Sequence, residues 1–167
     1  MKTLLVMRHA KSSWQNTGVP DHDRPLKLRG KVDAPQMGRF LRDQGLTPQL
    51  IISSTAKRAR KTAKLVAQAC GYESGIELED ELYNAGPTSY IRVLQGIDDQ
   101  YHQVMVVGHN PGLELLLEVL TGAPARMPTA ALARLELPID SWAEVREYVG
   151  GTLVDLWTPK TLRNGSG

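Results

Sequence analysis

Two arginines and two histidines in this chain have the side chains that phosphate chemistry needs. They are Arg8, His9, Arg58 and His109. A guanidinium binds two phosphate oxygens at once and stays charged at any physiological pH. A neutral imidazole can attack phosphorus and form a phosphohistidine that water then hydrolyses. Nearby cations lower the pKa of an imidazole and keep it neutral at pH 7. If these four side chains meet, the sequence predicts a pocket for a phosphoryl group.

The two histidines follow apolar runs that predict buried strands. His9 comes shortly after Thr3–Met7, and His109 comes shortly after Gln103–Val107. Continuous apolar runs of this length are typical of strands that are covered on both faces. In parallel sheets, ligands collect at the carboxyl ends of the strands. We therefore expect both histidines at the same edge of one sheet.

Arg58 comes from a third strand end. Leu50–Ser53 predicts a strand, and Thr55–Cys70 predicts the helix that follows it. Arg58 lies in the first turns of this helix, on the side that we expect to pack inward. A stripe of lysines on another side of the helix predicts a solvated face, or a surface for an acidic partner: Lys57, Lys61 and Lys64.

The rest of the chain alternates between strand and helix patterns. Further helices are predicted over residues 28–44, 87–97 and 111–121, and further strands over 76–78, 131–137 and 152–157. This alternation predicts an α/β layer architecture with a mostly parallel sheet. Asn110 is predicted to cap the helix that Pro111 opens, which would point a helix N-terminus at the pocket. Residues 142–149 fit either a helical turn or half of a hairpin.

Length and composition limit the class of protein. The chain has 167 residues, of which 41% are hydrophobic and 23% charged, and its net charge is +2. These values predict one globular domain, placed at residues 1–162 with a flexible tail at 163–167, and give no signal for nucleic acid. No apolar run approaches the roughly 20 residues that span a bilayer. The chain shows no signal-peptide pattern at its start, so we expect a cytoplasmic protein without a membrane partner.

Other phosphate chemistries do not fit the residues. The sixth residue after Cys70 is not an arginine, so a cysteine phosphatase loop is absent, and no Gly-x-x-x-x-Gly-Lys-Ser/Thr sequence occurs. Asp21 and Asp23 follow a proline rather than a strand, which argues against an aspartyl-phosphate site. His9 and His22 lack a compact second pair of metal ligands. We expect neither a metal nor another cofactor.

Four blocks, in this order, resemble the histidine phosphatase superfamily, which has the phosphoglycerate mutase-like fold. Leu5–Ala10 is similar to the opening Arg-His-Gly signature, with alanine at the glycine position. Asp23–Leu26 resembles the segment that leads into the first helix. Ser53–Ala63 resembles the Ser-Pro-x-x-Arg-Ala-x-x-Thr-Ala block, and Gly108–Pro111 the second histidine block. The resemblance implies a three-layer αβα domain with a minimal cap.

The resemblance also implies a role for each of the four side chains. His9 would be the nucleophile that carries the phosphoryl group. Arg8 and Arg58 would bind the phosphoryl oxygens, and His109 would stabilise the developing charge. No cofactor is implied.

Three further residues are predicted to bind substrate: Arg24, Gln15 and Asn110. Arg24 would extend the anion-binding surface, although it could instead pair with Asp21 or Asp23 in a surface loop. Gln15 replaces the asparagine that the family usually has. The neighbouring Trp14 fits either the mouth of the pocket or a cover over the core.

Within the superfamily, the chain resembles the SixA-type phosphohistidine phosphatases. The shared features are small size, Arg24-Pro-Leu26, Glu81–Tyr83 and the segment Trp157–Leu162. Only about 24 residues separate Asn84 from Gly108, which leaves no room for a large cap. An open pocket suits a phosphate displayed on another protein better than a small sugar phosphate.

The general acid of the superfamily is missing from its usual register. Many members place a glutamate two residues after a leucine, and here that position holds Asn84. Glu81 is a candidate for the acid, displaced by three residues. An alkoxide leaving group benefits from an acid, whereas the imidazole of a phosphohistidine leaves with less help. The missing glutamate therefore favours phosphohistidine.

The sequence thus predicts a phosphatase that acts through a phosphohistidine intermediate. Its favoured substrate is phosphohistidine on a protein, with inorganic phosphate as the product. One alternative is a small-molecule phosphomonoesterase that uses Glu81 as its acid. Another is an inactive phosphate-binding scaffold. We expect a monomer or a weak dimer.

Overall fold

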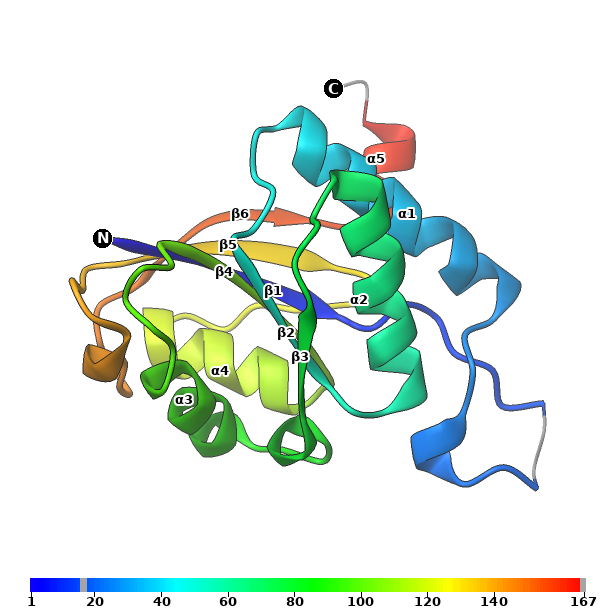
Figure 1. Cartoon of the computed structure of the whole chain (residues 1–167), viewed down its shortest axis with the longest axis horizontal. Coiled ribbons are helices and arrows are strands. Elements are labelled where there is room, and N and C mark those ends of the chain that lie inside the picture. The colour runs from blue at the N-terminus through cyan, green and yellow to red at the C-terminus, as the bar shows by residue number, and fades with distance from the viewer. Residues whose placement is uncertain (16–17, 166–167) are drawn as a thin grey trace.

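A six-stranded sheet forms the centre of the molecule (Figure 1), as described by a computed structural model over residues 1–15 and 18–165. The strands are β1 (Lys2–Arg8), β2 (Leu50–Ser54), β3 (Ile76–Glu79), β4 (Gln103–Gly108), β5 (Leu132–Leu137) and β6 (Thr152–Trp157). They lie in the order β3-β2-β4-β1-β5-β6. The first four strands of this order pair in parallel, and β5 pairs antiparallel with β1 and with β6. The predicted α/β class with a mostly parallel sheet is confirmed.

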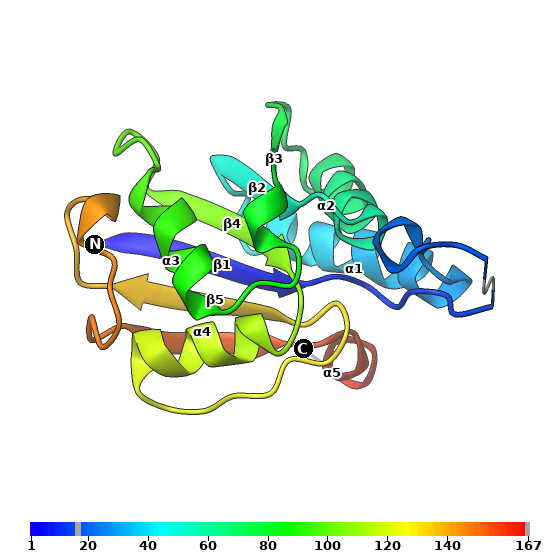
Figure 2. The ribbon, with the colours of Figure 1, turned by 90° about the horizontal axis from the view of Figure 1, so that it is seen from below.

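Helices cover both faces of the sheet, so the domain has three layers. They are α1 (Leu28–Asp43), α2 (Lys57–Cys70), α3 (Pro87–Gln95), α4 (Gly112–Thr121) and α5 (Pro159–Asn164). Figures 1 and 2 show α1, α2 and α5 on one face and α3 with α4 on the other. None of these helices is both long and apolar enough to cross a membrane.

The apolar run of β1 is continuous because side chains on both faces of the strand are buried. Leu4 and Val6 pack in the cluster that includes α3 and α4. Leu5 and Met7 pack in the cluster that includes α1 and α2. All four are completely buried, as expected for a strand in the middle of a parallel sheet. This packing fixes where β1 ends, and therefore where Arg8 and His9 begin.

Helix boundaries follow the predicted local signals. The helices α2 and α4 end at Gly71 and Gly122, whose φ angles of 81° and 82° lie in the left-handed region that glycine adopts without strain. Pro87 occupies the first position of α3. The open question at residues 142–149 is answered by a 3-10 turn at Trp142–Glu144, within the connection between β5 and β6.

The expected domain boundary at residue 162 falls inside the last helix, because α5 runs through Asn164. Thr158 and Thr161 form a capping box at its start, and Arg163 pairs with the buried Asp33 of α1 at 3.1 Å. These contacts tie the first residues of the expected tail to the domain. Residues 166–167 lie outside the described residues.

Candidate active site

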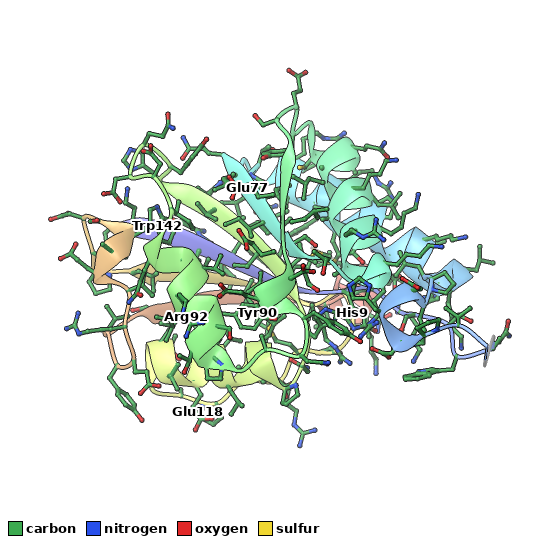
Figure 3. All side chains as sticks on the ribbon, turned by 60° about the horizontal axis from the view of Figure 1, so that its bottom comes forward. His9, Glu77, Tyr90, Arg92, Glu118 and Trp142 are labelled. Atoms are coloured by element: carbon green, nitrogen blue, oxygen red, sulfur yellow. The ribbon has the colours of Figure 1, made fainter. Side chains whose placement is uncertain are left out.

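A hollow of about 400 Å³ lies at the carboxyl ends of β1 and β4, next to the start of α2. Figure 3 shows His9 near one end of the sheet and Trp142 near the opposite end. Six of the eight site residues predicted from sequence line this hollow: Arg8, His9, Arg24, Arg58, His109 and Asn110. The parallel strands bring these residues together because their carboxyl ends share one edge of the sheet.

His9 is held in one orientation on the floor of the hollow. Its side chain is buried, and Nδ1 lies 2.8 Å from the carbonyl oxygen of Ala10. A carbonyl only accepts, so Nδ1 carries the hydrogen and Nε2 keeps its lone pair. Burial, followed by the charges of Arg58 and Arg8, lowers the pKa of His9 to about 4. The imidazole is therefore neutral at pH 7, and burial contributes more to this than the cations do.

His109 faces His9 across the hollow. The two ring centroids are 5.2 Å apart, and His109 Nε2 lies 2.8 Å from the buried hydroxyl of Ser54. Burial and then the neighbouring His9 lower the pKa of His109 to about 3. Its Nδ1 atom is buried without a hydrogen-bond partner among the described residues. When the Ser54 hydroxyl donates to Nε2, Nδ1 carries the hydrogen and is available to an anion.

Arg8 and Arg58 are anchored through their terminal nitrogens. Arg8 Nη1 donates to the carbonyl of Met127 at 3.1 Å. Arg58 Nη1 and Nη2 donate to the backbone carbonyl and the carboxylate of Asp21, at 2.7 and 3.1 Å. The Nε atoms of both arginines are buried and have no partner among the described residues. A buried N–H without an acceptor is costly, so both groups are suited to receive an oxyanion.

Asp21 is a site residue that the sequence did not single out. Its carboxylate accepts from Arg24 at 3.0 Å, from Arg58 at 3.1 Å and from the hydroxyl of Tyr83 at 2.6 Å. The hydrogen bond from Tyr83, followed by those from the arginines, holds the pKa of this carboxyl below its ordinary value. The ionised carboxylate fixes two guanidinium groups in the wall of the hollow. Only the contact between Asp21 and Arg24, three residues apart, was indicated by the sequence.

Arg24 lines the hollow and pairs with Asp21 at 3.0 Å. Its Nη1 donates to the Ser12 hydroxyl at 2.8 Å and to the Ser13 carbonyl at 3.2 Å. The guanidinium carbon lies 3.4 Å from the ring centroid of Trp14. Trp14 itself is 70% exposed at the rim. It therefore lies at the mouth of the pocket and does not cover the core.

Asn110 lines the hollow but does not cap a helix, so that prediction is wrong. The helix α4 begins at Gly112, with Pro111 as the residue before it and no side-chain cap. The Asn110 amide instead donates to the carbonyl of Met127 at 2.8 Å. The same carbonyl accepts from Arg8, so Asn110 and Arg8 share one anchor.

Gln15 and Glu81 lie outside the hollow. Gln15 is exposed and borders a separate shallow groove next to the start of α1. Glu81, in the 3-10 turn Asp80–Leu82, pairs with Arg92 of α3 at 3.4 Å and lines another groove. Asn84, in contrast, lines the hollow together with His109. The three-residue displacement seen in the sequence thus turns Glu81 away from the phosphate pocket.

Comparisons with known proteins identify the family to which this fold and this arrangement belong. A sequence model of the histidine phosphatase superfamily (branch 1) matches residues 4–86. An uncharacterised chloroplastic protein of Arabidopsis thaliana is 36% identical over 154 residues, which cover 86% of this chain and 70% of that protein. The chain belongs to the histidine phosphatase superfamily.

Solved structures place it beside the SixA proteins of that superfamily. SixA of Agrobacterium tumefaciens, provisionally named a phosphohistidine phosphatase, is 31% identical, with a TM-score of 0.81 over 95% of this chain and 98% of that one. The protein histidine phosphatase SixA in complex with tungstate is 23% identical, with a TM-score of 0.82 over 96% and 99% of the two chains. The predicted SixA-like fold is confirmed.

Proposed function

We propose that this protein is a phosphatase that removes the phosphoryl group from phosphohistidine on a protein, with His9 as the nucleophile. The observation that carries the proposal is the convergence of a neutral imidazole lone pair with three unpartnered buried nitrogens. These nitrogens are the Nε atoms of Arg8 and Arg58 and Nδ1 of His109. Donors placed around a transferring phosphoryl group stabilise the charge on its equatorial oxygens. The similarity to SixA supports the choice of substrate.

In the first step, the lone pair of His9 Nε2 forms a bond to phosphorus. The bond from phosphorus to the substrate nitrogen breaks, and that nitrogen keeps the electron pair. When the other nitrogen of the substrate ring carries a hydrogen, the leaving imidazole is neutral and needs no further proton. His9 Nδ1 keeps its hydrogen, which it donates to the Ala10 carbonyl. The phosphorylated His9 ring is therefore positively charged, which makes it a good leaving group when the intermediate is hydrolysed.

In the second step, a water oxygen forms a bond to phosphorus while the bond to His9 Nε2 breaks. The electron pair returns to Nε2, which restores the neutral imidazole. The two hydrogens of the water are shared between the phosphate product and the solvent. Arg8 and Arg58 bind the oxygens in both steps, so the same donors serve formation and hydrolysis of the intermediate.

Among the residues that the structure describes, no carboxyl group beside the phosphate pocket is free to act as an acid, which supports phosphohistidine over an alkyl phosphate. The carboxyl group of Asp21 lines the hollow, but its pKa is lowered and its oxygens are bound by arginines. Glu81 pairs with Arg92 in another groove. An alkoxide would leave without a proton from either group, at a high cost in rate.

Trapping the intermediate tests the nucleophile. Phosphohistidine is labile in acid, so the protein is mixed with a phosphohistidine peptide, quenched in alkaline denaturant and analysed by mass spectrometry. We expect a phosphoryl group on His9. The His9→Ala variant should lose turnover by about 10⁴-fold or more while still binding tungstate. His102→Ala, an exposed histidine outside the hollow, is the matched control. Retained hydrolysis by His9→Ala would falsify the nucleophile assignment.

A second measurement tests the substrate class. Glu81→Gln should leave kcat/KM within about twofold on both a phosphohistidine peptide and phosphoserine, because Glu81 lies outside the hollow. A large loss confined to phosphoserine would instead favour an alkyl phosphomonoesterase. The cytoplasmic location and the weak self-association predicted from sequence remain predictions.

A further inference from the structure

The proposed chemistry gives no role to Trp14, the residue at the rim with the largest exposed ring. Its side chain is 70% exposed although it borders the hollow that holds His9 and His109. Scattered exposed apolar residues are normal on a protein surface. Trp14 is different because it borders the same hollow as His9 and its ring lies against the buried Arg24.

The indole rests on a rigid base. The guanidinium of Arg24 lies 3.4 Å from the ring centroid, a stacking geometry that arginine forms well with aromatic faces. Arg24 is only 7% exposed, and its donors are bound by Asp21, Ser12 and Ser13. One face of the indole is thus covered and held in place. The exposed surface of Trp14 is therefore its other face and its edge.

The leaving group must pass this rim. In phosphoryl transfer, the attacking and leaving atoms lie roughly in line on opposite sides of phosphorus. His9 is 6% exposed, on the floor of the hollow, so the leaving atom points outward. The exposed side chains at the mouth include Trp14, Lys11 and Asn84. Of these, Trp14 offers an aromatic face, which a flat ring contacts in an offset-stacked or edge-to-face arrangement.

A second observation concerns protons. The hollow offers no free carboxylic acid among the described residues, because Asp21 is ionised and bound by two arginines. A leaving group must therefore depart without a proton from a protein carboxyl. Imidazoles and phenolates do this far more readily than alkoxides do. Both of these leaving groups are planar aromatic rings, the shape that an open indole face accommodates.

We infer that Trp14, positioned by Arg24, is a specificity-determining residue that stacks on the ring of the leaving group. The site then favours phosphate carried on a flat aromatic group, either the imidazole of phosphohistidine or an aryl ring, over phosphate on an alkyl oxygen. The inference rests on the proposed function only for the nucleophile, and it defines the substrate class of that same site.

The test measures kcat/KM for three substrates: a phosphohistidine peptide, p-nitrophenyl phosphate and phosphoserine. Trp14→Ala should lower the value by about 3- to 10-fold for the two ring substrates, the size of one aromatic contact. The value for phosphoserine and the inhibition constant of tungstate should change by less than about twofold. Trp14→Phe should retain most of the ring-substrate activity. Tyr148→Ala, an aromatic residue 74% exposed and outside the hollow, is the matched control.

Three results overturn the inference. The first is an equal loss on all three substrates, and the second is no loss on any of them. The third is a weaker tungstate affinity in Trp14→Ala, which would mean that Trp14 acts only through Arg24 on the phosphate pocket.

The inference and the proposed function fail separately. If the wild-type protein hydrolyses the aryl phosphate with the expected dependence on Trp14 but leaves the phosphohistidine peptide intact, the protein substrate is wrong and the role of Trp14 stands. If phosphohistidine is hydrolysed through His9 and Trp14→Ala behaves like Tyr148→Ala, the proposed function stands and the role of Trp14 is wrong.

Discussion

Cationic side chains lie at both ends of β1, and the two ends differ in what surrounds them. At the amino end, Lys2 is 2% exposed, and its ammonium group lies 2.8 and 3.1 Å from the carbonyl oxygens of Asp99 and Tyr101. At the carboxyl end, Arg8 and Arg58 keep buried Nε atoms without a partner among the described residues. A cation whose donors are satisfied by carbonyls stabilises the fold. Cations whose donors remain unsatisfied create a site for an anion.

Each end also places a tryptophan next to a cation, Trp142 next to Lys2 and Trp14 next to Arg24, and here the contrast is one of exposure. Trp142 is completely buried, and its ring centroid lies 5.9 Å from the Lys2 ammonium nitrogen. Its indole N–H donates to the Tyr101 carbonyl oxygen at 2.7 Å. Trp14 is 70% exposed above Arg24. A cation next to an indole ring is thus part of the buried structure at one end of the strand, whereas at the other end the indole stays accessible to a ligand.

Among the tests of this comparison between the two ends, removing an arginine from the carboxyl end should give the largest effect. Arg58→Ala should lower kcat/KM on a phosphohistidine peptide by about 10²- to 10³-fold, the loss typical of one donor to a developing charge. Arg58→Lys should not restore it, because lysine lacks the planar fork. Steady-state kinetics with thermal melting as a folding check measure this. The nearby exposed Arg60→Ala should stay within about twofold, and an equal loss there would contradict the comparison.

Acid should destabilise the carboxyl end through its histidines. The folded pKa values of His9 and His109 are about 4 and about 3, below the value near 6.5 expected in the unfolded chain. The unfolded state therefore binds more protons as pH falls through the window from about 6.5 to 4. Stability is lost in that direction, at up to about 1.4 kcal/mol per pH unit for each histidine.

Urea unfolding of the wild type and of His109→Gln between pH 4.5 and 7 measures this loss. We expect the wild type to show the steeper dependence on pH, because it has one more buried histidine that must become protonated on unfolding. Equal slopes for the two proteins would show that His109 binds its proton to the same extent in the folded and unfolded states, which would contradict the lowered pKa.

The smallest effect should come from the amino end, and it should appear in stability alone. Lys2→Ala removes the donor to the Asp99 carbonyl and one of the two donors to the Tyr101 carbonyl, which also accepts from Trp142. We expect this loss to cost about 1–3 kcal/mol of unfolding free energy. Activity should stay within about twofold, because Lys2 lies at the opposite end of β1 from His9. A loss of activity with unchanged stability would reverse the roles assigned to the two ends.

The parts of the fold predicted from sequence are those that depend on local pattern. The apolar runs of β1 and β4 identified their strands, and the parallel order then placed His9 and His109 at one edge. Glycines at the ends of α2 and α4 were equally informative. These signals arise from burial and backbone conformation, which act on neighbouring residues.

The parts that could not be predicted depend on contacts between distant segments. Asp21 reaches Arg58 across 37 positions of sequence, and nothing near either residue indicates that contact. Asn110 fits a cap by type, but the Met127 carbonyl captures its amide. Arg163 is held by Asp33, 130 positions earlier. A polar side chain finds its partner only after the chain has folded, so its role is poorly encoded in its neighbourhood.

The placement of Trp14 provides an intrinsic optical reporter. The chain contains three tryptophans, of which Trp142 is fully buried, Trp157 partly buried and Trp14 largely in water at the rim of the hollow. Its emission is sensitive to any ring that docks against the indole, whereas the fully buried Trp142 is shielded from such a ring. Ligand occupancy can therefore be followed by fluorescence quenching in the unlabelled protein.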